Sequence, residues 1–152
     1  MKRRLGLLAL VAGLAALGAQ GAQSGTAHLS GGGTASIGDV AFSQVAMNVS
    51  FGNAGTASGS FTCLMAGRSK GVLDAFGLAH IMKVQATPTA GSVSWPTATF
   101  SGPGFLSTDG GQRMSINVIV SVNVATQTFQ LTVVEIGALP VETFSSGGVN
   151  LR

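Results

Sequence analysis

The chain has 152 residues, with 8 Lys and Arg against 5 Asp and Glu, and only 9% of its residues are charged. Lys2, Arg3 and Arg4 stand at the N-terminus, so the rest of the chain carries five basic and five acidic residues. This balance gives no evidence for the clustered basic surface that nucleic-acid binding requires, and we predict no nucleic-acid partner. The single cysteine, Cys63, excludes an intramolecular disulfide.

The first 21 residues have the layout of a secretory signal peptide. The three basic residues precede an uncharged run rich in Leu and Ala at 5–17, and Ala19, Gln20 and Gly21 offer a small-x-small cleavage site. The run is too short for a membrane core that needs about 20 apolar residues. We therefore predict a signal-peptide helix at 1–21 and a secreted β-domain at 22–152, located outside the cell or in the periplasm and with no membrane span after cleavage. An uncleaved N-terminal anchor stays open as the alternative.

Apolar residues then recur at every second position, which predicts strands with one buried and one wet face. The pattern is clearest in 45–51, 57–65 and 114–124. We predict strands at 25–30, 34–38, 41–51, 56–66, 79–87, 92–101, 112–124, 128–136 and 143–151. The first two form one strand if Gly31, Gly32 and Gly33 kink the chain without ending the strand.

Short turn sequences at 52–55, 108–111 and 125–128 separate these runs, and connections this short join antiparallel neighbours. The sequence therefore predicts an all-β fold: a single antiparallel meander of about eight strands, closed in the manner of a barrel, with a β-sandwich as the alternative. Residues 71–82 fit either a short helix or an irregular strand, and we favour a loop with one helical turn before a strand that begins near Ala79. Pro96 predicts an edge or a bulge within 92–101.

A search for reactive groups predicts no catalytic, cofactor or metal site. His28 and His80 are the only histidines, and both fall in strand-like runs. Cys63 shares a strand face with Phe61 and Met65, which favours a buried apolar role over a reactive thiol or an intermolecular disulfide. If a site exists, His80, Cys63 and His28 are its candidates.

The order of short segments along the chain resembles a group of uncharacterised β-rich domains of secreted bacterial proteins, which often stand beside surface-anchoring modules. The segments are Gly-Gly-Gly at 31–33, Gly-Ser-Phe-Thr-Cys at 59–63, Lys-Val-Gln-Ala-Thr at 83–87, Ala-Thr-Phe-Ser-Gly-Pro-Gly at 98–104, Phe-Gln-Leu-Thr-Val at 129–133 and Gly-Gly-Val-Asn-Leu at 147–151. Those domains often carry an Asp-rich turn where this chain has Ala-Thr-Gln-Thr at 125–128. The resemblance implies a secreted β-domain and no activity.

These observations favour a non-catalytic exported β-domain with a structural, interaction or cell-surface role. Two alternatives are a barrel that binds a small apolar ligand, lined by Met47, Phe61, Met65 and Met114, and a self-assembling subunit of an extracellular fibre or surface layer. An enzyme stays open as well, because a catalytic constellation assembled across a fold is invisible in one sequence. Self-association or a surface partner is compatible with the neutral charge, and the sequence names no small-molecule ligand.

Overall fold

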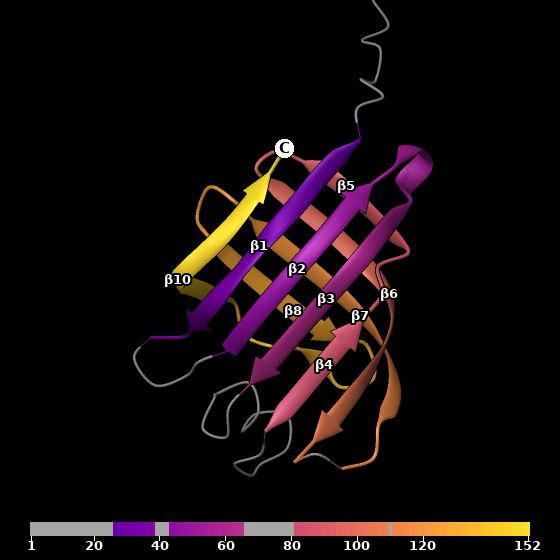
Figure 1. Ribbon diagram of the computed structural model, residues 1–152, viewed down its shortest axis with the longest axis vertical. Helices are drawn as coiled ribbons and strands as arrows, with labels where there is room; N and C mark the ends of the chain where they lie inside the picture. Colours follow the sequence, from indigo (N-terminus) through magenta and orange to yellow (C-terminus); the bar gives the residue numbers. More distant parts are fainter. Residues whose placement is uncertain (1–25, 39–42, 66–80, 110) are drawn as a thin grey trace, which may run out of the picture.

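The computed structural model describes residues 26–38, 43–65, 81–109 and 111–152 (Figure 1). These residues form an all-β, antiparallel structure whose only helical segment is the short 3-10 helix η1 (Asn53–Gly55). Within them, no helix has the length and hydrophobicity to cross a membrane. The predicted signal-peptide helix at 1–21 and most of the ambiguous stretch 71–82 lie outside the described residues.

Ten strands belong to one sheet. They are β1 (Ala27–Ser36), β2 (Ser43–Phe51), β3 (Ala57–Met65), β4 (Met82–Ala86), β5 (Ala90–Ser94), β6 (Thr97–Thr108), β7 (Met114–Asn123), β8 (Thr128–Val133), β9 (Gly137–Ala138) and β10 (Glu142–Leu151).

The sheet closes on itself as a ring of eight strands. The pairing runs β10-β1-β2-β3-β4-β6-β7-β8, and β8 pairs with β10 to complete the ring. That last junction holds only two residue pairs, Glu142 with Phe129 and Thr143 with Thr128. The rest of β10 pairs with β1, from Thr143 opposite Ser36 to Leu151 opposite Leu29. The ring is therefore much more thinly joined between β8 and β10 than between its other neighbours.

The ring is arranged as two layers (Figure 1). Strands β10, β1, β2, β3 and β4 lie side by side in the front layer, and β6, β7 and β8 cross behind them in a different direction. Strand β6 connects the layers, because its first half pairs with β5 and its second half with β4. At the opposite side, β10 pairs with β8 at its start and with β1 along most of its length.

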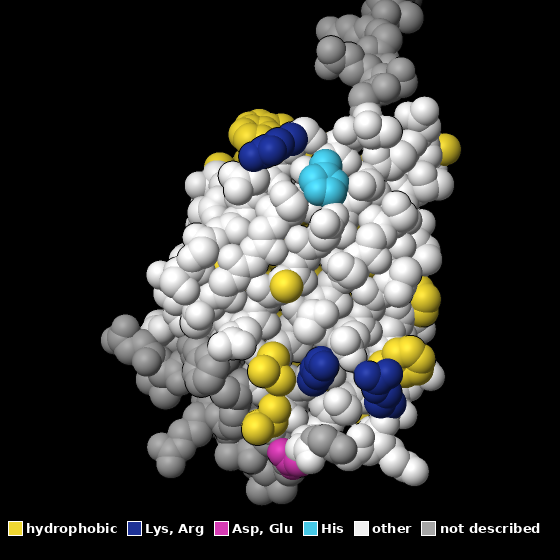
Figure 2. All heavy atoms as spheres, viewed as in Figure 1, with side chains coloured by type: hydrophobic (Ala, Val, Ile, Leu, Met, Phe, Trp, Pro, Cys, Tyr) yellow, Lys and Arg dark blue, Asp and Glu magenta, His cyan; other side chains and the backbone are white. Residues whose placement is uncertain are grey.

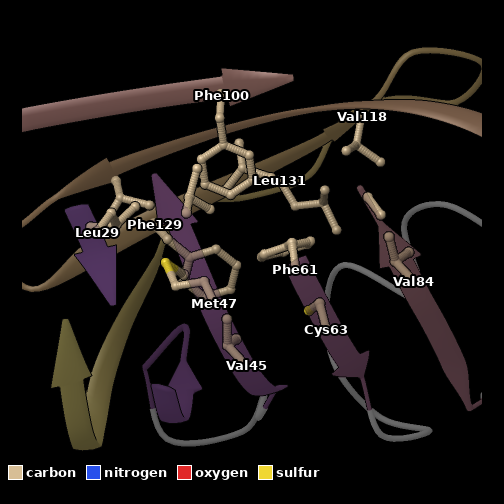
Figure 3. Packing of buried hydrophobic residues seen from close by; sticks show 14 of the residues in the cluster. Leu29, Val45, Met47, Phe61, Cys63, Val84, Phe100, Val118, Phe129 and Leu131 are labelled. Carbon is tan, nitrogen blue, oxygen red and sulfur yellow. The ribbon is translucent and has the colours of Figure 1, made fainter. Parts of the chain in front are cut away.

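The predicted alternation is the physical basis of this fold. Along β2, residues 43, 45, 47, 49 and 51 are buried and those between them are exposed. Buried side chains from both layers meet between the layers (Figure 3), where Phe61 and Phe100 pack edge to face with ring centroids 5.7 Å apart. A buried aromatic side chain of this kind contributes roughly 1.5–3 kcal/mol by leaving water. The wet faces carry mostly Ser, Thr, Asn and Gln, as the low charge content predicts.

Glycine allows β1 and β10 to approach each other closely. Gly33 has a φ of +151°, and a Cβ atom at this position would overlap the carbonyl oxygen of Ser146 on β10. Gly33 faces Gly147 across the pair, and Gly32 faces Gly148. The run at 31–33 therefore lies inside one continuous strand, which agrees with the interpretation of 25–38 as a single strand.

Two predicted strands need correction. The run 92–101 is not one strand, because Trp95 and Pro96 form the turn of a hairpin between β5 and β6. Pro96 therefore lies in a turn, and neither in an edge strand nor in a bulge. The run 128–136 ends at Val133, and the chain turns back through β9. The three predicted turns at 52–55, 108–111 and 125–128 do connect successive strands.

Candidate functional site

Of the three candidate residues from the sequence, the two that the structure describes, Cys63 and His28, do not lie together. Cys63 lies inside the ring and is 1% exposed. His28 lies on the outer face of β1, where its Nδ1 is 3.1 Å from the hydroxyl oxygen of Ser50 on β2. The wall of the sheet thus separates the thiol from this imidazole. His80 lies outside the described residues.

Cys63 has polar neighbours that the sequence did not reveal. The hydroxyl of Ser43, on β2, donates a hydrogen bond of 2.8 Å to Oε1 of Glu142, on β10. Ser43 is fully buried and Glu142 is 3% exposed. Burial raises the pKa of the Cys63 thiol, the carboxyl of Glu142 raises it further, and a hydrogen bond with Ser43 lowers it. The thiol therefore stays protonated and is a poor nucleophile at neutral pH.

Glu142 is the most perturbed acid of the described residues. Burial raises its pKa to about 7, against the smaller lowering effect of the Ser43 hydrogen bond. Its second oxygen, Oε2, is buried without a hydrogen-bond partner among the described residues. Desolvation penalises the charged carboxylate far more than the neutral acid, which explains the direction of the shift. The described residues hold no group of three or more His, Cys, Asp or Glu side chains that could bind a metal ion.

The sequence gives only a weak indication that Glu142 is buried. Ser43 and Glu142 are 99 residues apart, and only the closure of the ring brings them together. Glu142 and Phe144 share parity, which places both toward the interior. The register between β1 and β10 shifts after Thr34, however, so parity along β10 does not carry through to its end.

A groove of about 690 Å³ lies on the outer face, where β3, β4, β6 and β7 meet. Six of its lining side chains carry hydroxyl or amide groups. These are Ser60, Thr62, Gln85, Thr87, Ser115 and Asn117. Gly102 shapes this region, because a Cβ atom there would overlap the carbonyl oxygen of Thr87. The close crossing of β6 over the chain beyond β4 therefore depends on a residue without a side chain.

Arg113 and Phe105 form the most distinctive feature of the groove. The guanidinium carbon of Arg113 lies 5.7 Å from the centroid of the Phe105 ring, and Nη2 of Arg113 donates a 3.0 Å hydrogen bond to Oε1 of Gln85. Phe105 is 46% exposed, so part of its side chain faces solvent beside the guanidinium. A cation held over an aromatic ring and fixed by an amide is a preorganised pair.

A second groove of about 510 Å³ continues across the front layer and shares Thr62 with the first. Gln44, Ala46, Leu64 and Lys83 line it, so its character is more apolar. Figure 2 shows Lys and Arg side chains beside hydrophobic ones at the lower end of this face, on a surface that is otherwise mostly uncharged.

Of the four residues that the sequence suggested as the lining of an interior ligand cavity, three are buried and one is exposed. Met47, Phe61 and Met65 belong to the buried core cluster. Met114 stands at the start of β7 and is 48% exposed, so it does not line the interior. Comparisons of the chain with protein-family models, with curated proteins and with solved structures found no match.

Proposed function

We propose that this chain is an exported, non-catalytic β-domain with an interaction role, and that its partner lies in the outer groove between β3, β4, β6 and β7. The observation that carries the proposal is the pairing of an exposed aromatic ring, Phe105, with the fixed guanidinium of Arg113 in a groove lined by hydroxyl and amide groups. Export rests on the signal-peptide pattern of residues 1–21.

The chemistry of the groove favours a hydroxyl-rich polymer such as a polysaccharide. A sugar ring presents C–H groups that stack on an aromatic ring, and hydroxyl groups that exchange hydrogen bonds with guanidinium, amide and hydroxyl side chains. The lining residues that the structure describes include no carboxylate, but the carboxylate of Glu135 accepts hydrogen bonds from Asn117 at the edge of the groove, which favours a neutral saccharide over an acidic one.

The test is affinity electrophoresis of the mature protein through native gels that contain soluble polysaccharides: dextran, galactomannan or polygalacturonate. We expect at least one of these to retard the protein. Phe105→Ser then weakens the binding about tenfold, since an aromatic contact contributes about 0.5–1.5 kcal/mol beyond its buried area. Ile119→Ser is the matched control, because Ile119 is 42% exposed on β7 and does not line the groove. Absence of retardation in every gel, or equal retardation of the Phe105 and Ile119 variants, would refute the assignment of the groove.

The non-catalytic part of the proposal has its own test. Burial keeps the thiol of Cys63 protonated, and His28 stands on the other side of the sheet from it. We therefore expect the mature protein to show no hydrolase or transferase activity. A measured activity that is lost on changing His28 or His80 would contradict the proposal.

One observation favours self-assembly as a second candidate function. Within the described residues, most of β10 has no strand on the side away from β1, because β10 pairs with β8 at only two positions. Exposed strand edges are templates for pairing with another chain. Light scattering of the mature protein at high concentration tests this candidate: concentration-dependent oligomers support it, and a strict monomer removes it. The interior apolar-ligand alternative is tested by native mass spectrometry, in which a co-purified ligand supports it.

A further inference from the structure

Glu142 occupies the position on which closure of the ring depends. It is one of the two residues of β10 that pair directly with β8, opposite Phe129. Beyond this junction the contact is continued by the amide of Phe144, which donates a 2.9 Å hydrogen bond to the carbonyl of Gln127. A change in the state of Glu142 therefore acts at the most thinly paired point of the ring.

The carboxyl of Glu142 has few contacts among the described residues that would stabilise its ionised form. It is 3% exposed, it accepts one hydrogen bond from Ser43, and Oε2 has no hydrogen-bond partner among the described residues. A buried carboxylate normally needs several hydrogen bonds or a positive partner to offset its lost hydration. The neutral acid meets this requirement at much lower cost.

The groups that the described elements bring to this carboxyl are few. Strand β3 contributes the thiol of Cys63, which titrates far above neutral pH in this position. Strand β2 contributes the hydroxyl of Ser43, β8 contributes Phe129 opposite Glu142, and β1 contributes Ala35 opposite Ser43. Of these only Cys63 is titratable and none is cationic, so within the described residues only a proton neutralises Glu142.

We propose that Glu142 is a proton-controlled latch on the ring: the junction between β8 and β10 is closed while the carboxyl carries its proton, and it opens when the carboxyl ionises. Opening moves the side chain toward water and releases the start of β10 from β8. The hydrophobic core of β2, β3, β6 and β7 does not take part, because these strands are paired along most of their length.

The raised pKa of Glu142 determines how closure of the ring depends on pH. The closed form holds its proton up to about pH 7, whereas an exposed glutamate releases it near 4.5. Between these two values the closed form binds more protons than the open form, so closure weakens as the pH rises. The ratio of closed to open molecules falls about tenfold for each pH unit, which gives roughly a 300-fold change over the interval of about 2.5 units. Below about pH 4.5 and above about pH 7 the ratio is constant.

Hydrogen exchange measured by NMR on the full mature domain tests the latch. After correction for the intrinsic pH dependence of exchange, the protection of the Phe144 amide falls steeply between pH 5 and pH 7. The amide of Thr89 bonds to the carbonyl of Ser101 away from this junction and serves as the internal reference, with constant protection. Glu142→Gln keeps an acceptor for Ser43 and cannot ionise, so its Phe144 amide stays protected at every pH.

A wild-type Phe144 amide with constant protection would overturn the proposal, as would a Glu142→Gln variant that keeps the same pH dependence. If Glu142→Gln does not fold, Ser43→Ala takes its place. The hydrogen bond from Ser43 lowers the pKa of Glu142, so its removal raises that pKa, and the fall in Phe144 protection continues to a higher pH before it levels off. A fall that levels off at the same or a lower pH in Ser43→Ala would equally refute the latch. Neither result bears on the polysaccharide gels, which test the outer groove separately.

Discussion

The side chain of Gln127 pairs with β10 on the side where the described residues provide no strand. We expect its removal to lower the free energy of unfolding more than its position near the surface suggests. Its Nε2 donates to the carbonyl oxygens of Val124, at 2.6 Å, and Val149, at 3.0 Å. Its Oε1 accepts from the amide of Val149 at 2.9 Å. One side-chain amide thereby satisfies both backbone groups of a β10 residue that has no strand partner on that side.

The magnitude follows from counting the groups that Gln127→Ala leaves unpaired. Each net hydrogen bond contributes about 0.5–1.5 kcal/mol, so the loss of three predicts a decrease of about 2–4 kcal/mol in the free energy of unfolding. Gln130→Ala is the matched control: its Nε2 makes one hydrogen bond, to the carbonyl of Leu139. We expect it to lose about 1 kcal/mol.

Urea unfolding at 25 °C, followed by circular dichroism, measures both variants against the wild type. The account predicts that Gln127→Ala loses clearly more stability than Gln130→Ala, with an unchanged dependence on urea concentration. Exchange of the Val149 amide should also accelerate in the first variant and not in the second. Equal losses in the two variants, or a Val149 amide that stays protected without Gln127, would refute the view that this side chain bridges the gap.

Three further outcomes are expected. Phe100→Ala lowers the free energy of unfolding by about 3–5 kcal/mol, and the exposed Ile119→Ala by less than about 0.5 kcal/mol, in the same urea assay; similar losses would contradict the packing of the core. Cys63 reacts with a thiol reagent only after unfolding in urea, so rapid labelling of the native protein would show that the thiol is accessible. The thermal midpoint of the wild type falls as pH rises from 4.5 to 7, since about 3 kcal/mol of stability is lost over that interval through Glu142; a rise would contradict its protonation in the folded state.

The fold class was predictable because alternation is a local signal. Strand β2 shows a strict buried-exposed order that its sequence displays directly, and the turn at 125–128 follows from short-range chemistry. In that turn the side chain of Asn123 accepts hydrogen bonds from the amides of Ala125 and Thr126, both at 3.0 Å. Such patterns involve residues that are close together in the sequence, so the sequence alone reveals them.

The candidate site was less predictable because it depends on pairing between distant strands. The hairpin at Trp95 and Pro96 was missed because β-forming residues stand on both sides of the turn. That error hid the length of β6, whose second half forms a wall of the outer groove. Glu142 was missed for a similar reason: its burial requires the closure of the ring, and one sequence does not reveal which strands close it.

The central claim is that the eight strands close into a ring through β8 and β10. In this junction Thr128 and Thr143 are direct partners. The amide of Phe144 donates a hydrogen bond to the carbonyl of Gln127 in the adjacent pair. Because hydrogen-bonded and non-hydrogen-bonded pairs alternate between antiparallel strands, Thr128 and Thr143 form a non-hydrogen-bonded pair, whose α carbons are closely spaced. NMR of the mature protein at pH 5 should therefore show a strong nuclear Overhauser effect between the α protons of these two threonines. Its absence, in a protein whose β7 and β8 show their own cross-strand effects, would mean that the ring is open.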